Sequence, residues 1–297
     1  MNTRKLRDII GTNLMRIATL FISLLFFLIL VLLIYRSTLV LETHSITDVL
    51  FSSIWNPDNG QFGLSAVIID TILVTGIALL VAIPISLLSA IYIVEYAPLR
   101  LRRTIRPFID VLAGVPSVVY GLCAFLFLAP FVKDFVAPWF GVQSTGLCIF
   151  SAAIILSIMV FPIIISLCIE SFDAIPISLK EASLSIGATK WETIKKVIFR
   201  AAAPSVIAAI LLGFGRAFGE TIAVNMVIGG TIRIPSTIFN PGETLASLIA
   251  SKYGELMSIP LHESALMLVA LILFIVVLLF YFLGFLLLRR AKKRWNY

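Results

Sequence analysis

Residues 71–94 read TILVTGIALLVAIPISLLSAIYIV, a run without a single charged side chain. A helix that crosses the hydrocarbon core of a bilayer needs about 20 consecutive, mostly apolar residues. This run is therefore predicted to be a membrane span. Five further runs of similar size predict five more spans: Ile17–Tyr35, Val111–Val132, Thr145–Ile169, Ala201–Ile232 and Ser264–Leu288.

The composition of the whole chain fits six spans. Of the 297 residues, 60% are hydrophobic and only 13% are charged, whereas soluble domains carry about 25% charged residues. This excludes a soluble enzyme, a secreted disulfide scaffold and a disordered chain. The fold class expected is an all-α integral membrane protein with six transmembrane helices.

Basic residues gather on one side of the predicted spans. Of the 23 Lys and Arg residues, 18 lie in the two terminal tails and in the loops after the second and fourth spans, and four lie in the other loops. Because Lys and Arg are enriched in cytoplasmic loops, both termini are expected in the cytoplasm. The net charge of +7 then indicates contact with membrane lipid and no nucleic acid.

This topology divides the chain into three parts. Residues 1–66 hold the N-terminal cytoplasmic tail, the first span and an outer loop, and residues 67–288 form the transmembrane core with a cytoplasmic loop at 171–204. A basic cytoplasmic tail follows at 289–297. In the last outer loop, residues 242–257 are expected to form a helix at the membrane interface.

Several catalytic and cofactor motifs are absent from the sequence. No Gly-x-x-x-x-Gly-Lys-Ser/Thr motif occurs, so the chain does not bind ATP through a P-loop of its own. Neither a His-Glu-x-x-His motif nor a Cys/His cluster occurs, so no metal site and no catalytic residues are expected. Cys123, Cys148 and Cys168 all lie in apolar runs and are expected to be small buried hydrophobic residues.

The cytoplasmic loop 171–204 is predicted to contain a short helix capped by Ser178, with Glu181 as the reciprocal partner of the cap. Leu179, Ala182 and Ile186 lie on one side of this helix, Gly187 ends it, and Thr189 caps a second helix that leads into the fifth span. The apolar side is buried either on the chain itself, in the lipid interface, or in a groove of a partner protein.

The fifth predicted span contains two charged residues, Arg216 and Glu220. Arg216 lies about 18 Å along the helix from its inner end, near the bilayer centre. A lipid-facing Arg there costs from about 2.5–3.5 to more than 10 kcal/mol, so it must face protein or a wet path. Glu220 at i+4 can pair with it, and Gly215 and Gly219 form a small-xxx-small packing pair.

Two interpretations of this span remain open. In one, Arg216 and Glu220 are a buried ion pair that holds the helix against a neighbour. In the other, Arg216 faces an anionic substrate in a translocation path that also includes Glu220, Thr221 and Ser117. Ser117 follows Gly114 and Pro116, which are expected to break the third span, although a simple kink explains these residues equally well.

Two other charged residues, near the ends of spans, are weaker candidates for the translocation path. Asp70 is expected near the outer surface at the start of the second span, and Asp110 near the inner surface at the start of the third. Both are interpreted as capping or interfacial residues.

Four segments carry a resemblance to a known family. Glu181-Ala182-Ser183 followed by Gly187 resembles the EAA loop of ABC-importer permeases. The segments EYAP at 95–98, LAGVPSVVYG at 112–121 and GRAFGETIAV at 215–224 resemble signatures of phosphate-importer permeases, most closely of the PstC-type subunit. The resemblance runs from about Trp55 to the C-terminus.

The resemblance implies a type I ABC importer fold, MetI-like, and a transmembrane subunit that is not itself an enzyme. It implies a multi-pass protein of the cytoplasmic (inner) membrane that imports inorganic phosphate. The implied partners are a PstA-type permease that completes a heterodimer, a dimeric PstB-type ATPase that docks on Glu181, Ala182, Ser183 and Gly187, and an extracytoplasmic PstS-type phosphate-binding protein. ATP and Mg would be held by the ATPase, and this chain would bind no cofactor.

Three alternatives are weighed against this interpretation. A secondary transporter coupled to ions through Glu220 needs no ATPase, but leaves the docking-type loop unexplained. A permease for another oxyanion, such as sulfate or molybdate, is opposed only by the phosphate-type segments. A signalling or scaffold protein gives Arg216 no evident use.

Overall fold

The computed structural model describes residues 3–256 and 258–295. The outermost residues of the predicted tails (1–2 and 296–297), and Met257 of the predicted outer helix, lie outside the described residues. In the described part, six helical segments are long and apolar enough to cross a membrane, as the sequence predicts. They are Ile10–Thr43, Ser65–Tyr96, Ser117–Trp139, Ile149–Asp173, Lys190–Gly219 and Pro260–Ala291.

The elements in chain order are α1 (Thr3–Thr43), α2 (Ile46–Phe51), β1 (Trp55–Asn56), η1 (Pro57–Asn59), β2 (Gln61–Phe62), α3 (Ser65–Ile91), η2 (Tyr92–Tyr96), α4 (Leu99–Gly114), α5 (Ser117–Cys123), η3 (Ala124–Leu128), α6 (Ala129–Phe131), η4 (Val132–Val136), α7 (Ala137–Trp139), α8 (Ile149–Asp173), α9 (Ile177–Ser185), α10 (Lys190–Thr193), η5 (Ile194–Ile198), α11 (Phe199–Gly219), α12 (Ile222–Ile228), α13 (Leu245–Leu256) and α14 (Pro260–Trp295). Strands β1 and β2 pair antiparallel in a small hairpin.

Two predicted span boundaries are wrong. The third span begins at Ser117 and not at Val111, because Pro116 lacks an amide hydrogen and the preceding helix α4 ends at Gly114. The fifth span starts earlier than predicted, at Lys190, and its main helix α11 ends at Gly219. The predicted continuous helix 201–232 is therefore divided into α11 and the short α12.

Two prolines of the third span, Pro130 and Pro138, follow π-helical turns. Segment η3 lies just before Pro130, and η4 lies just before Pro138. Proline blocks the hydrogen bond to the residue four positions earlier, and a wider turn relieves the clash that its ring makes there. The helix consequently runs on from Ser117 to Trp139.

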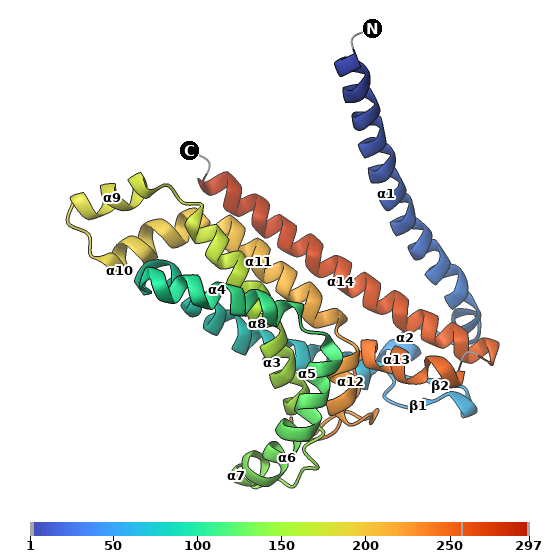
Figure 1. The fold of residues 1–297 in the computed structure, drawn as a ribbon. Helices are drawn as coiled ribbons and strands as arrows, with labels where there is room; N and C mark the ends of the chain where they lie inside the picture. The colour runs from blue at the N-terminus through green and yellow to red at the C-terminus, as the bar shows by residue number, and fades with distance from the viewer. Residues whose placement is uncertain (1–2, 257, 296–297) are drawn as a thin grey trace.

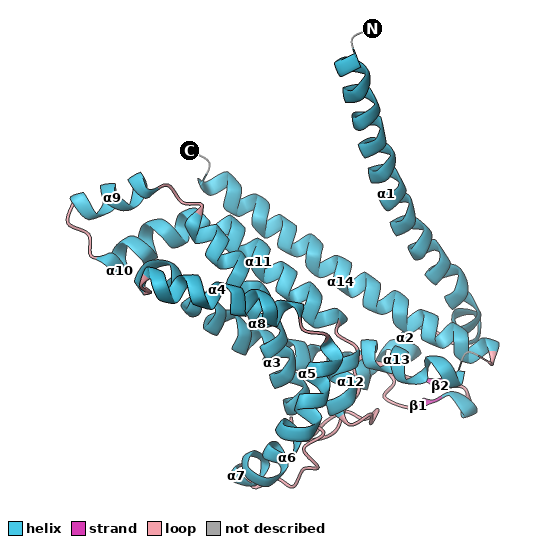
Figure 2. Ribbon diagram, in the orientation of Figure 1, coloured by secondary structure: helices cyan, strands magenta, loops and turns pink. Residues whose placement is uncertain are grey.

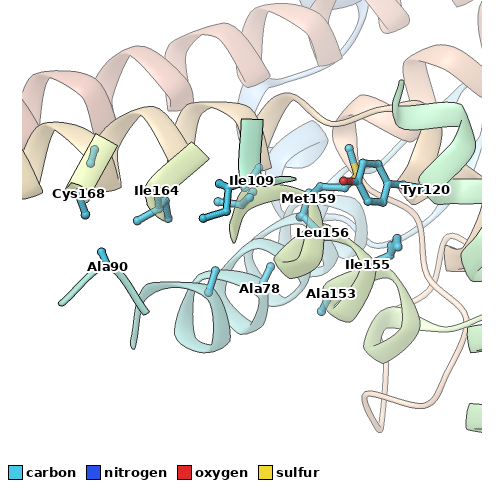
Figure 3. Close-up of a cluster of buried hydrophobic side chains, with 14 of the residues drawn as sticks. Ala78, Ala90, Ile109, Tyr120, Ala153, Ile155, Leu156, Met159, Ile164 and Cys168 are labelled. Carbon is cyan, nitrogen blue, oxygen red and sulfur yellow. The ribbon is translucent and has the colours of Figure 1, made fainter. Parts of the chain in front are cut away.

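The main core lies where α3 packs against α8 (Figure 2). Helix α8 is the most enclosed span, and α3 turns small residues such as Ala78, Ala82 and Ala90 towards it. Figure 3 shows Ala78 and Ala90 beside the larger side chains of α8, among them Leu156 and Ile164. Small residues on one helix allow close approach of the other, which is how membrane helices gain packing energy.

A second core lies at the opposite end, where the end of α1, the β hairpin, α13 and the start of α14 meet. The predicted interfacial helix is present as α13, but Leu245 and Leu248 are buried in this core rather than placed in lipid. His262 Nε2 lies 3.0 Å from the carbonyl oxygen of Pro57, and Arg36 forms an ion pair with Glu263 at 2.7 Å.

Both ends of the described chain lie on one side of the molecule, the same side as α9 and α10 (Figure 1). The hairpin and α13 lie on the other side. Helix α1 packs on α14 near the hairpin and diverges from it towards its N-terminal end, and the side chains of residues 12–29 are exposed.

Candidate functional site

Two helix breaks define the candidate path. One separates α4 from α5 at Val115 and Pro116, and the other separates α11 from α12 at Glu220 and Thr221. The short helices that follow the breaks pack side by side, α5 against α12 (Figure 1). Gly121 permits this contact, because a methyl group there would lie only 3.0 Å from Ala223 Cα.

Arg216 lies in the last turn of α11, three residues before the second break. Its side chain is half-buried, and its Nε atom is buried without a hydrogen-bond partner among the described residues. The guanidinium group is close enough to Tyr120 of α5 to interact with it electrostatically. The Tyr120 hydroxyl donates to the Leu112 carbonyl at 2.8 Å and so bridges the first break.

The expected ion pair between Arg216 and Glu220 is wrong for this conformation. Glu220 is the C-cap of α11, and its extended backbone (ψ 123°) turns the residues that follow it out of the helix. Its Oε1 instead accepts a hydrogen bond from the Ala223 amide at 3.3 Å, at the start of α12. Thr221 Oγ1 donates to the Gly219 carbonyl at 3.1 Å. Within the residues that the structure describes, Arg216 therefore has no carboxylate partner.

Ser117 is the first residue of α5, directly after the first break, and is half-buried. The predicted path residues thus lie at the two breaks: Ser117 at one, and Arg216, Glu220 and Thr221 at the other. Because α5 packs on α12, the two breaks belong to one region of the fold.

The glycines of the predicted packing pair differ in their surroundings. A methyl group at Gly215 would meet the Tyr281 hydroxyl of α14 at 2.0 Å, whereas one at Gly219 would have nothing within 4 Å. Both glycines line an apolar cavity of about 540 Å³ between α1, α11 and α14. Gly215 therefore lies at the contact with α14, and Gly219 beside open space.

The loop 171–204 forms the predicted pair of helices. Ser178 does not cap the first, because α9 already begins at Ile177, with Pro176 as the preceding residue. Gly187 ends this helix as predicted, with φ +88°: its amide donates to the Leu184 carbonyl, and the next amide donates to the Ser183 carbonyl. Such paired bonds after a left-handed glycine are a common helix ending.

The second predicted cap is confirmed. The Glu192 amide donates to Thr189 Oγ1 at 3.3 Å, and the Thr189 amide donates to Glu192 Oε2 at 3.1 Å. These reciprocal bonds satisfy amides that have no partner within α10.

The predicted docking residues of α9 fall into two groups. Glu181 and Ala182 are exposed, while Ser183 is buried and its hydroxyl lies 2.9 Å from that of Thr193 on α10. Large apolar side chains of the loop are also exposed, Ile177 by 70% and Ile186 by 85%. One face of α9 thus packs on α10, and the rest is free to contact a partner.

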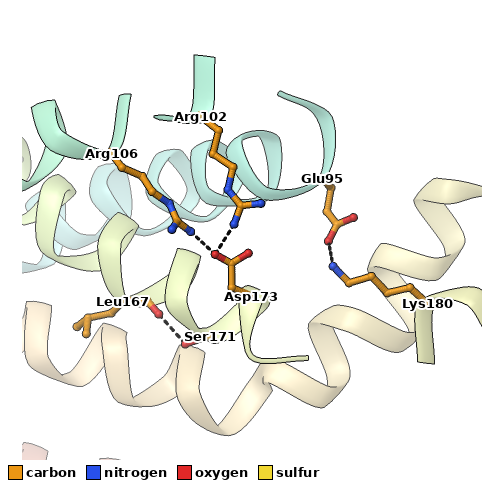
Figure 4. A network of polar contacts seen from close by, with 7 residues as sticks. All are labelled: Glu95, Arg102, Arg106, Leu167, Ser171, Asp173 and Lys180. Carbon is orange, nitrogen blue, oxygen red and sulfur yellow. Dashed lines mark hydrogen bonds and ion pairs between the residues drawn. The ribbon is translucent and has the colours of Figure 1, made fainter. Parts of the chain in front are cut away.

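Asp173, at the end of α8, accepts hydrogen bonds from Arg102 and Arg106 of α4 (Figure 4). Sequence reasoning counted the two arginines only as topology signals. Asp110 of the same helix accepts a hydrogen bond from Ser166 at 3.3 Å. These contacts fix α4 against α8 beside the first helix break.

The prediction for Asp70 is wrong, since this residue is fully buried. Its Oδ2 accepts a hydrogen bond from the Glu243 amide at 2.9 Å, and the hydroxyl of neighbouring Thr71 accepts one from the Leu245 amide at 2.9 Å. The outer segment before α13 is therefore bound to α3. No sequence signal identifies these pairs, because the partners lie 173 and 174 residues apart.

The described residues contain no cluster of three or more His, Cys, Asp or Glu side chains that could hold a metal ion. The site is thus built from one half-buried cation, hydroxyl groups and backbone at two helix breaks. Such a site can bind and release an anion, and it offers no nucleophile held by a base.

Comparison with known proteins defines the family. Residues 82–295 match the family described as binding-protein-dependent transport system inner membrane component. The phosphate transport system permease protein PstC of Xylella fastidiosa (strain 9a5c) is 35% identical over 258 residues, which cover 82% of this chain and 79% of that protein. The probable PstC of Methanocaldococcus jannaschii is 33% identical over 92% of this chain and 90% of that protein. This chain belongs to the PstC-type permeases of that family.

Solved structures agree with the family's fold. The inward-facing MetNI methionine ABC transporter contains a chain that superimposes on this permease with a TM-score of 0.62, at 20% identity, covering 80% of this chain and 99% of that one. A bacterial alginate ABC transporter with its periplasmic protein gives 0.58 at 15% identity, over 77% of this chain and 79% of that one. The permease has the MetI-like fold of ABC importers and is a multi-pass membrane protein.

Proposed function

We propose that this permease is a transmembrane subunit of an ATP-driven ABC importer that moves inorganic phosphate across the cytoplasmic membrane. The observation that carries the proposal is Arg216, a half-buried cation without a carboxylate partner, at the place where two broken helices adjoin. The PstC proteins that are about one-third identical to this chain are phosphate transport permeases.

Phosphate suits this site for chemical reasons. A guanidinium group can donate two parallel hydrogen bonds to phosphate oxygens, and it stays charged at any physiological pH. In the described conformation the Glu220 carboxylate is held at the start of α12, one break away from the cation. We infer that Glu220 approaches Arg216 only between transport events, so that the cation binds phosphate weakly and releases it.

The loop helix α9 is the proposed docking element for a cytoplasmic ATPase. Its exposed residues Glu181 and Ala182, with the apolar side chains of Ile177 and Ile186, offer a half-apolar face that nothing else in the described chain covers. The ATPase, present in two copies, would hold ATP and Mg. Closure of the ATPase pair would pull α9 and turn the path outward.

The remaining partners follow from the same assembly. A second, PstA-type permease would complete the path beside α5 and α12, and a phosphate-binding protein would deliver substrate at the hairpin side. Both ends of the described chain lie on the side of α9, so docking of an ATPase there would put that side in the cytoplasm.

Uptake of phosphate into vesicles tests the role of Arg216. Arg216→Gln is expected to lower uptake about 30-fold or more, the size of effect seen when one member of a buried charged hydrogen bond is removed, while the complex still assembles. Arg216→Lys keeps the positive charge but loses the two parallel donors of the guanidinium group. Its phosphate uptake is expected to lie between that of the wild type and that of Arg216→Gln. Unchanged uptake by Arg216→Gln contradicts the proposal, and loss of folding shows that Arg216 has a structural role.

Two controls separate the alternatives. Glu181→Lys is expected to release the ATPase, whereas uptake that persists without any ATPase indicates an ion-coupled secondary transporter. If excess sulfate or molybdate competes for transport more effectively than phosphate does, the chain is a permease for another oxyanion.

A further inference from the structure

The segment Glu95-Tyr96-Ala97-Pro98 at the end of α3 has no role in the site described above. Helix α3 ends in the π-helical turn η2, and the Ala97 amide donates to the Tyr92 carbonyl at 2.8 Å. Pro98 is the N-cap of α4, which begins at Leu99. The turn presents two neighbouring side chains, those of Glu95 and Tyr96, to the cytoplasmic loop.

Glu95 forms an ion pair with Lys180 of α9 (Figure 4). The side chains are only 12% and 22% exposed. A pair with so little solvent contact is screened less than a surface ion pair, so it holds its two elements together more firmly. Lys180 directly precedes Glu181, the residue proposed to face the ATPase.

Tyr96 contacts the other helix of the loop. The ammonium group of Lys190, the first residue of α10, lies 4.5 Å from the centre of the Tyr96 ring. A cation over an aromatic face at this distance is attracted by the ring. Adjacent residues of α3 therefore hold one lysine on each side of the turn between α9 and α10.

The loop itself is a firmly connected unit. The buried hydroxyl contact between Ser183 and Thr193 joins α9 to α10, and the cap formed by Thr189 and Glu192 fixes the turn between them. From α10 the chain runs through η5 into α11, which carries Arg216. The loop thus has covalent links to α8 and α11, and a direct noncovalent link to η2 at the end of α3.

The far end of α3 is bound to the outer side of the protein. Asp70 and Thr71 accept hydrogen bonds from the amides of Glu243, which precedes α13, and Leu245, the first residue of α13. One helix consequently joins the cytoplasmic loop to the outer segment that follows the second helix break.

We propose that Glu95 and Tyr96 form a clasp that passes the movement of α9 to α3, and through α3 to the outer segment 242–245. This inference rests on the proposed ATP-driven function. Glu95 and Tyr96 are positioning residues: they touch neither substrate nor ATPase, and they make the outer end of the path respond to the docking helix. Without the clasp, α9 is linked to α3 only indirectly, through its connections to α8 and α11.

Charge reversal in the reconstituted, complete transporter tests the clasp. Glu95→Lys leaves the exposed face of α9 unchanged, so the ATPase is expected to co-purify at the wild-type level while phosphate uptake per ATP hydrolysed falls at least tenfold. Combining it with Lys180→Glu restores the ion pair in reverse and is expected to recover uptake to within about threefold. Lys196→Glu is the matched control for Lys180→Glu, because it makes the same charge change on an exposed residue of the same loop, and it is expected to keep the wild-type ratio.

Amide hydrogen exchange supplies a second measurement, one that is not expected to change through ATPase docking alone. In the wild type, exchange of a peptide covering residues 242–245 is expected to differ between the nucleotide-free and the vanadate-trapped transporter. In Glu95→Lys this difference is expected to disappear. If uptake per ATP stays within threefold of wild type, or if the exchange difference persists, the clasp is refuted.

Two further variants keep the result decisive. If Glu95→Lys fails to assemble, the isosteric Glu95→Gln replaces it, with the same expected loss of coupling, and Tyr96→Leu tests the second contact separately. A wild-type complex that takes up phosphate without hydrolysing ATP refutes the proposed function itself. If the wild type and Glu95→Lys both couple uptake to ATP hydrolysis, only the clasp is refuted.

Discussion

Gly213 offers the sharpest test of the packing that positions Arg216. It lies in α11 one turn before the arginine and faces α8. A methyl group at Gly213 would lie 2.8 Å from the Cδ1 and Cγ1 atoms of Ile164 and 3.1 Å from Val160 Cγ1. Both of these side chains are 0% exposed, so neither can swing away into lipid.

The size of the effect of Gly213→Ala follows from two opposing terms. Overpacking a filled core costs about 1–3 kcal/mol, and replacing Gly by Ala inside a helix gains about 0.5–1 kcal/mol. Gly76, an exposed glycine inside α3, has nothing within 4 Å of an added methyl group. Gly76→Ala therefore carries the helix gain alone, and the two variants are expected to differ by about 1–3 kcal/mol.

Thermal unfolding of the purified chain in one detergent measures this difference. At roughly 2 °C for each kcal/mol in a chain of this size, the melting temperature of Gly213→Ala should lie about 2–6 °C below that of Gly76→Ala. Ile164→Ala alone also destabilises the protein. In the double variant Gly213→Ala/Ile164→Ala, however, the new methyl group occupies part of the space that Ile164 vacates, so the loss of stability should be smaller than the sum of the two single losses. Equal melting temperatures for the two alanine variants, or strict additivity in the double variant, refute the contact.

Further predictions concern helix packing and buried carboxyl groups. Gly215→Ala should lower phosphate uptake and stability more than Gly219→Ala, because only the former meets a side chain of α14; equal effects contradict this. Asp70→Ala should cost about 1–3 kcal/mol by leaving the Glu243 amide unpaired, and Asp70→Asn, which keeps an acceptor oxygen, should cost less in the same melting assay. Burial raises the pKa of Glu243 above its ordinary value of 4.5, so its contribution to stability is greatest below that pH and falls as pH rises through the folded-state pKa. Because glutamine does not titrate, the melting temperature of Glu243→Gln should rise relative to that of the wild type as the buffer is changed from about pH 5 to about pH 8. A difference in melting temperature that does not change with pH excludes this titration.

The spans were predictable because membrane solvation acts on each helix separately. A run such as 71–94 must be helical in lipid whatever surrounds it, so local composition is sufficient. The turn at Gly187 and the cap at Thr189 were predictable for a similar reason, since their hydrogen bonds join residues within a few positions of one another.

The errors arose where distant partners or a helix break decide the structure. Asp70 near a span end resembles an interfacial residue, and only the amide of Glu243, 173 positions away, makes it a buried anchor. Glu220 lies four residues after Arg216, a spacing that favours an ion pair inside a continuous helix, but here the helix ends at Gly219 and the carboxylate accepts a hydrogen bond from the Ala223 amide instead. The sequence draws attention to residues that lie at the two helix breaks, but it does not indicate that Arg216 lacks a carboxylate partner among the described residues.

The contact between α1 and α14 has a consequence for how the protein is made. The Val40 amide donates to Ser264 Oγ at 3.1 Å across 224 positions of the chain, and Arg36 reaches Glu263 across 227. At about 5–20 residues per second, the ribosome needs roughly 10–45 seconds to progress from one partner to the other. During that interval α1 lies in lipid without its partner helix. Its apolar side chains allow this, because almost none of them is buried against the rest of the protein. The first helix to enter the membrane is thus among the last to find its neighbour, and a chain released early lacks both contacts.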